Sequence, residues 1–73
     1  MSKYIGLLKP DSQKFLIAMA EAELSPVELA AKAGISVNFV YSMRRGKYTK
    51  PKYLGACCRV LNVKVNDVVE SEV

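Results

Sequence analysis

The chain has 73 residues and a formal net charge of +4; 51% of its residues are hydrophobic and 25% are charged. A chain of this length forms one small domain, whose core is too small for a deep catalytic pocket. It has no histidine, no glycine-rich phosphate loop and no nucleophile beside a base. We therefore expect no enzymatic activity and no cofactor.

The sequence contains no segment of the kind that crosses a membrane. No apolar run reaches the ~20 residues of a bilayer-spanning helix. The N-terminus lacks the long apolar stretch and the small-residue cleavage site of a signal peptide. We therefore expect a cytoplasmic protein. The adjacent Cys57 and Cys58 match no zinc-ligand spacing and suit no structural disulfide, so we expect them in a helix core, without metal.

Positive charge is concentrated in one part of the chain. Between Leu29 and Asn66 there are eight lysines or arginines and no acidic residue, while the acids lie in two outer groups, 11–28 and 67–72. A basic face kept only for solubility would show interspersed signs. The pattern instead predicts a strongly positive surface that favours a polyanion.

The first elements are an arm and a long helix. We expect residues 1–10 to form an N-terminal arm that packs on the domain of residues 11–73, because Gly6 and Pro10 interrupt any regular element. A first helix should begin at a cap formed by Asp11 or Ser12 and run to about Glu23. Its centre is apolar on more than one face, so the arm or a partner subunit should cover the extra face.

Residues 25–46 read as two short helices joined by a tight turn. Ser25 is placed as N-cap, with Pro26 at the first helical position and Glu28 completing a capping box. Gly34 should end this helix in the left-handed conformation. Ser36 should cap the second helix and Gly46 should end it; its inward stripe is predicted to comprise Phe39, Val40 and Met43.

A basic connector and two further helices complete the predicted fold. Residues 47–52 form the connector, and apolar residues at helical spacing predict a helix from Tyr53 to about Asn62. Val63 and Val65 should point inward. Asn66 should cap a last short helix over 67–70. The predicted fold is therefore all-α, a compact arrangement of five helices.

The motif of residues 25–46 resembles the helix-turn-helix of the phage repressor and Cro-like (XRE-type) family. The family's small residue, glycine turn and apolar positions are matched by Ala30, Gly34, Ile35, Val40 and Met43. The resemblance spans roughly residues 12–69. It implies a repressor-like DNA-binding domain and a sequence-specific transcriptional regulator of double-stranded DNA, namely a repressor. Pro26 departs from the glutamine that many relatives use to hold a phosphate.

An α-helix fits the major groove of B-DNA, and residues 36–45 are the predicted reading helix. Its outward residues suit base edges: Asn38 pairs well with adenine, Arg45 with guanine, and Val37 with a thymine methyl. The resemblance implies base contacts at four positions, and Arg45 joins them by its chemistry. Expected base contacts are Val37, Asn38, Tyr41, Ser42 and Arg45; expected phosphate contacts are Ser36, Lys32, Arg44, Lys47, Lys50 and Lys52.

One such helix touches too few base pairs for high specificity, so we expect a homodimer on an inverted-repeat operator. The two-fold contact is expected at the C-terminal end, around Val68, Val69 and Val73. The arm, with Tyr4, Ile5, Leu7 and Leu8, and the first helix at Ile17 are the alternatives. The alternative function is an antitoxin-like or recombination accessory module that binds protein. Salt-dependent binding to duplex DNA distinguishes the two functions.

Overall fold

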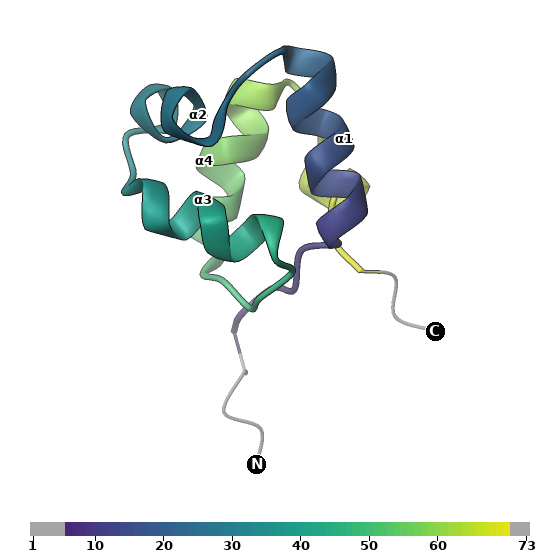
Figure 1. The fold of residues 1–73 in the computed structure, drawn as a ribbon. Coiled ribbons are helices and arrows are strands. Elements are labelled where there is room, and N and C mark those ends of the chain that lie inside the picture. The colour runs from purple at the N-terminus through teal and green to yellow at the C-terminus, as the bar shows by residue number, and fades with distance from the viewer. Residues whose placement is uncertain (1–5, 71–73) are drawn as a thin grey trace.

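The computed structural model of the protein describes residues 6–70, which form four α-helices and one short 3-10 helix. Figure 1 shows α2 and α3 on one side of α4, with α1 on the other. Within residues 6–70 there is no strand, and no helix is both long and apolar enough to cross a membrane. The elements are α1 (Ser12–Ala22), α2 (Pro26–Ala33), α3 (Val37–Arg44), α4 (Pro51–Leu61) and the 3-10 helix η1 (Val65–Asp67).

The helix ends follow the local signals closely. Asp11 caps α1, its carboxylate accepting the backbone N–H of Lys14 at 3.0 Å. The capping box of α2 is confirmed, with the Ser25 hydroxyl accepting the Glu28 N–H at 3.1 Å and the Glu28 carboxylate accepting the Ser25 N–H at 2.9 Å. Gly34 ends α2 in the left-handed conformation, at φ 73°. These local bonds satisfy helix-end groups that would otherwise lack partners.

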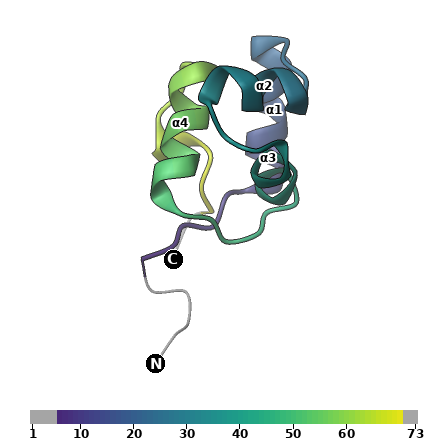
Figure 2. The same ribbon diagram turned by 90° about the vertical axis from the view of Figure 1, so that its left-hand side faces the viewer.

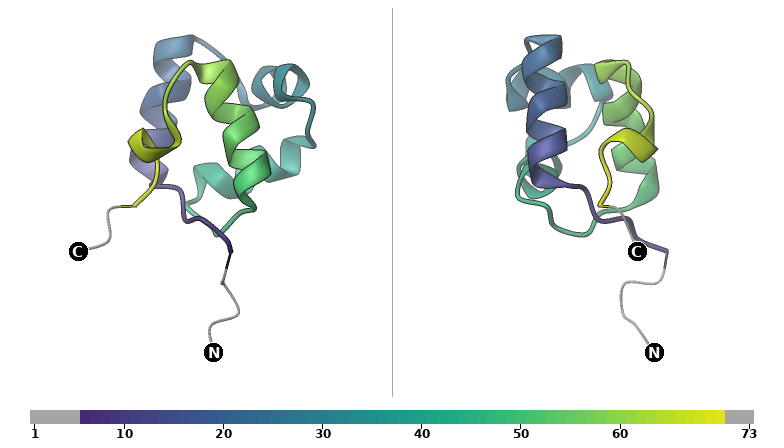
Figure 3. Two further views of the ribbon diagram at one scale, coloured as in Figure 1. Left: turned by 180° about the vertical axis from the view of Figure 1, so that it is seen from behind. Right: turned by 90° about the vertical axis from the view of Figure 1, so that its right-hand side faces the viewer.

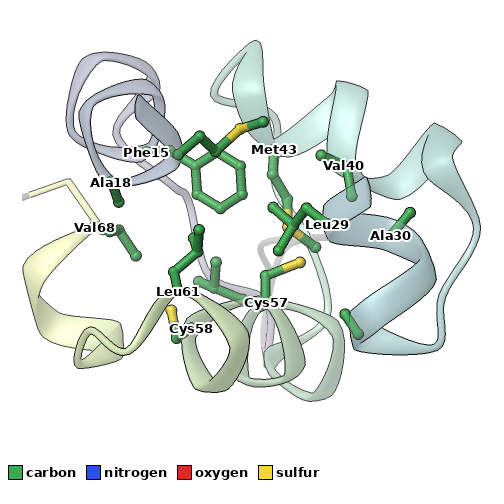
Figure 4. Packing of buried hydrophobic residues seen from close by; sticks show 13 residues of the cluster. Phe15, Ala18, Leu29, Ala30, Val40, Met43, Cys57, Cys58, Leu61 and Val68 are labelled. Carbon is green, nitrogen blue, oxygen red and sulfur yellow. The ribbon is translucent and has the colours of Figure 1, made fainter. Parts of the chain in front are cut away.

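The core lies where α1, α2, α3 and α4 meet. In Figure 4 the Phe15 ring points from α1 toward Met43 of α3 and Leu61 of α4. Cys57 and Cys58 are buried in this core, as predicted. Burying such side chains is the main favourable contribution to folding.

The prediction of a helix over residues 67–70 is wrong, and the predicted total of five α-helices is therefore wrong too. The chain instead makes the single 3-10 turn η1, in which the Asp67 carboxylate accepts the Lys64 N–H at 3.2 Å. Val68 then enters the core, 1% exposed, and Val69 pairs with Pro10 in an isolated β-bridge. This extended pairing is incompatible with a continued helix. Figure 3 shows the turn packed beside α1 and α4.

The described part of the arm, residues 6–10, packs on the domain as predicted. Leu8 and Thr49 exchange backbone hydrogen bonds of 2.9 and 2.8 Å, and the Glu70 N–H donates to the Lys9 carbonyl at 3.0 Å. This part of the arm therefore lies between the α3–α4 connection and the C-terminal segment. It leaves Leu16 and Ile17 of α1 about half exposed, so the predicted cover of that face is not supplied by residues 6–10.

Candidate nucleic-acid interface

The helix pair α2–α3 is built around a turn in which every predicted signal is present. The Gly34 and Ile35 N–H groups both donate to the Ala30 carbonyl, at 2.9 and 3.1 Å, and Ala30 is buried where the helices meet. The Ser36 hydroxyl accepts the Asn38 N–H at 3.3 Å, which caps α3. A small residue beside the turn lets the two backbones approach closely.

One face of α3 is open to solvent. Val40 and Met43 are fully buried, which fixes the inward side of the helix. Asn38, Ser42 and Arg45 follow one another at spacings of four and three residues and therefore share the opposite side. Asn38 and Arg45 are exposed and Ser42 is partly exposed. We call these three residues the reading face.

Two predicted DNA contacts lie at one edge of this face. The Arg44 guanidinium carbon lies 5.4 Å from the centroid of the Tyr41 ring, within the range of a cation–π contact. Both side chains are partly buried. Val37, which was expected on the outward side, is half-buried and packs against the core. Its place in the first turn of α3 next to α2 explains this difference.

Phe39 was predicted to point inward, and this is wrong. Its side chain is 38% exposed and stacks on Tyr53 of α4, with ring centroids 4.3 Å apart and planes at 19°. Phe39 lies at the flank of α3 opposite Tyr41, where the core ends. The pairing joins residues fourteen positions apart across the α3–α4 connection, so no helical periodicity indicates it.

Residues 47–50 form a basic segment between Gly46 and α4, directly after the reading face, and we call this segment the connector. The predicted connector extended to residue 52, but α4 begins earlier than predicted, at Pro51. Figure 2 shows the connector along the lower edge of the molecule, linking the two helices. The helix α3 ends at Arg44 with Arg45 as C-cap, and Gly46 follows in the left-handed conformation, at φ 77°. The Lys47 N–H donates to the Ser42 carbonyl at 3.0 Å. Lys47 and Lys50 are exposed in the connector, and Lys52 is exposed in the first turn of α4.

The remaining predicted phosphate contacts frame the turn of the motif. Lys32 is exposed in the last turn of α2, and Ser36 is exposed directly after the turn. At α4, Lys50 occupies the N-cap position without a side-chain cap hydrogen bond. The first N–H groups of a helix attract anions, so the start of α4 adds to the positive character of the connector.

The last turn of α3 is held by residues that sequence reasoning had not assigned to the site. The Ser12 hydroxyl donates to the Arg44 carbonyl at 2.7 Å, and the Lys9 ammonium donates to the Gly46 carbonyl at 2.9 Å. The Lys9 ammonium also pairs with the Glu70 carboxylate at 2.9 Å. This hydrogen bond raises the pKa of Lys9 above its ordinary value. No local sequence signal connects these distant positions.

The two buried thiols stay protonated at neutral pH and are therefore poor nucleophiles and poor metal ligands. Burial raises the pKa of both Cys57 and Cys58 to about 11, so each keeps its proton at neutral pH. Metal binding requires the deprotonated thiolate. Across residues 6–70, no three His, Cys, Asp or Glu side chains come together as a metal site would require.

A capped helix pair with a glycine turn and an open, partly polar face on the second helix defines a helix-turn-helix DNA-binding domain. The family model of the Cro/C1-type HTH DNA-binding domain matches residues 14–72, and the chain belongs to this family. The resemblance expected from residues 25–46 is thereby confirmed. No curated protein and no solved structure matches the chain.

Proposed function

We propose that the protein is a sequence-specific regulator of transcription, a repressor that reads the major groove of double-stranded DNA with α3. The observation that carries this proposal is the reading face beside a basic connector. Asn38, Ser42 and Arg45 lie on one side of a helix whose other side is fixed in the core. The segment between Leu29 and Asn66 contains no acidic residue that would repel a phosphate backbone.

The side chains of α3 suit different base edges. The Asn38 amide is able to donate and accept together, as the N6 and N7 edge of adenine requires, and the Arg45 guanidinium fits guanine O6 and N7. Ser42 and Tyr41 add single hydrogen-bonding groups beside them. The exposed part of Val37 supplies an apolar contact for a thymine methyl. Contacts of this kind carry the sequence preference.

The basic and capping residues around α3 supply affinity without sequence choice. Phosphate contacts fix the register of the helix in the groove, and each one releases a counterion. We assign this role to Ser36 and Lys32 near the turn, to Arg44 at the edge of α3, and to the lysines after it. Those lysines are Lys47, Lys50 and Lys52.

We further propose that two copies bind an inverted repeat, with half-sites about one helical turn, ~34 Å, apart. Val68 does not form the two-fold contact, because its side chain lies inside the core. Tyr4, Ile5 and Val73 lie outside the described residues. Of the three surfaces that the sequence offers for the two-fold contact, the face of α1 keeps large apolar side chains exposed: Leu16 is 47% exposed and Ile17 is 48% exposed.

Selection of bound sites from a random duplex pool, followed by footprinting, tests the proposal. We expect an enriched inverted repeat, binding that weakens steeply with salt, and two protomers per duplex by sedimentation. One protomer per duplex would overturn the dimer. A protein that shows no salt-dependent binding to any duplex would instead be a protein-binding module, and the regulator proposal would fail. Placing the selected site in a reporter promoter then tests repression.

A further inference from the structure

A hollow of 340 Å³ opens beside the reading face, between α3, the connector and the start of α4. Three aromatic rings line it: Phe39 from α3, Tyr48 from the connector and Tyr53 from α4. Leu7 of the arm, Ser42, Thr49 and Lys50 complete the wall. We call this hollow the aromatic groove.

The chemistry of the groove combines apolar surface with positive charge. Phe39 is 38% exposed and Tyr48 is 41% exposed, although large rings are normally covered in a small domain. The Lys50 ammonium lies 6.0 Å from the centroid of the Tyr53 ring, and no acidic side chain lines the hollow. The groove therefore fits a ligand that presents an apolar face together with a negative group.

Its position relates it to the proposed DNA contact. Ser42 belongs both to the reading face and to the wall of the groove. The groove therefore directly adjoins the side of α3 that is proposed to face the bases. In a duplex, the neighbour of a base edge in the major groove is the sugar–phosphate backbone of one strand.

We propose that the aromatic groove seats one nucleotide of the DNA backbone, with the deoxyribose against the rings of Phe39 and Tyr48 and its phosphate at Lys50. This inference rests on the proposed function. A deoxyribose offers the apolar face and the phosphate the negative charge. An extruded base is a poorer fit, because the Phe39 and Tyr53 rings already stack at 4.3 Å and leave no slot between them.

The two parts of this contact respond differently to salt. The phosphate at Lys50 releases a counterion, so removing the lysine lowers the slope of log K against log salt. Burial of apolar ring surface releases no ion and contributes the same affinity at each salt concentration. Neither part reads a base, so both should act equally on specific and non-specific duplexes.

The test compares Tyr48→Ala, Phe39→Ala and Lys50→Ala with wild type on the selected duplex and on a random one. Val27→Ala serves as control, because it truncates an apolar side chain of α2 that is 61% exposed and lies outside the groove. We expect each ring variant to bind both duplexes roughly fivefold to tenfold more weakly with an unchanged salt slope. Lys50→Ala should lower the slope by about 0.9. Tyr48→Phe should bind like wild type, because the ring remains.

Thermal melts identify any variant that fails to fold. If Phe39→Ala fails to fold, the comparison of Tyr48→Ala with Tyr48→Phe tests the inference alone. Unchanged affinity of Tyr48→Ala would overturn the inference. So would a loss confined to duplexes that carry an unpaired base, since the groove would then hold a base. Replacing single nucleotides by an abasic tetrahydrofuran sugar should leave the ring effect intact. If wild type binds no duplex at all, the proposed function itself fails.

Discussion

The Ser12 hydroxyl donates a hydrogen bond to the Arg44 carbonyl at 2.7 Å, so the start of α1 holds the last turn of the helix proposed to read DNA. Ser12→Ala removes this bond and leaves a helix-end carbonyl without its partner. We expect a loss of about 1 kcal/mol in the free energy of unfolding, measured by urea titration. We also expect weaker binding to the selected duplex. Ser12→Thr keeps the hydroxyl and should behave like wild type; equal losses in both variants would contradict this role.

The two glycines at the ends of the motif helices should differ in how well each position tolerates an added side chain. Both are left-handed, Gly34 at φ 73° and Gly46 at φ 77°, and asparagine accepts this conformation better than other side chains. A Cβ at Gly34 meets open space, whereas one at Gly46 already touches the Pro10 carbonyl oxygen at 3.4 Å and Ser12 Cβ at 3.5 Å.

We therefore expect Gly34→Asn to be nearly neutral and Gly46→Asn to cost about 1–3 kcal/mol, because its further atoms must displace Pro10 or Ser12. Denaturant unfolding of the two variants measures the difference. If both glycines accept asparagine equally, the end of α3 is not held against residues 10–12.

Asn38 should matter for DNA binding and not for folding. Its side chain is exposed on the reading face, so Asn38→Ala removes no core contact. We expect a loss of about 1–3 kcal/mol in binding to the selected duplex and a relaxed preference at one base pair. Titration of the selected duplex and of single-base variants measures both. Val27→Ala, which truncates an exposed side chain on α2, is the matched control. Equal binding by Asn38→Ala and wild type would show that this face does not read bases.

The three lysines after α3 should contribute to affinity through charge alone. Lys47, Lys50 and Lys52 are exposed, and replacing them by alanine should lower the salt slope by about 0.9 for each phosphate that is no longer neutralised. Specific and non-specific duplexes should weaken alike. Affinities measured from low to moderate salt give the slope. An altered base preference with the wild-type slope would show that these lysines do not bind phosphates.

The two buried thiols should make stability depend on pH above neutrality. Burial raises each thiol pKa from its ordinary 9.0 to about 11, so the unfolded chain loses these protons first as pH rises. Their stabilising contribution is complete below pH 9 and declines as pH approaches 11, by up to about 3 kcal/mol for each thiol. Unfolding titrations at pH 8 and pH 10.5 measure the decline. The double variant Cys57→Ala, Cys58→Ala should lose less stability over this pH range; an identical loss would show that the two thiols do not cause the decline.

Local signals predicted the start and end of the helix pair correctly. Ser25, Glu28 and Gly34 act within a few residues of the helix ends that they define, so their roles are readable without the fold. The same reasoning places Asn62, at φ 59°, as the left-handed end of α4. The inward positions of Val40 and Met43 follow from helical period in the same way.

The errors arose where distant segments meet. Phe39 sits at the edge of the inward stripe, and its stacking partner Tyr53 belongs to another helix. The expected last helix failed because Val68 fills the core and Val69 pairs with the arm. The bonds from Lys9 and Ser12 to the end of α3 cross more than thirty positions in sequence. Capping patterns and periodicity contain no information about such contacts.

The pairing of the arm with the C-terminal segment, through the Lys9 carbonyl and the Glu70 N–H at 3.0 Å, joins positions 61 residues apart. Closing a longer loop adds little to the entropic cost, but contacts so distant in sequence form slowly. The helices α1 to α4 pack through shorter loops and are expected to assemble first. The Lys9 bond to the Gly46 carbonyl lies at the junction where the two ends of the described chain meet. We therefore expect this junction to be the last part of the domain to close and the first to open.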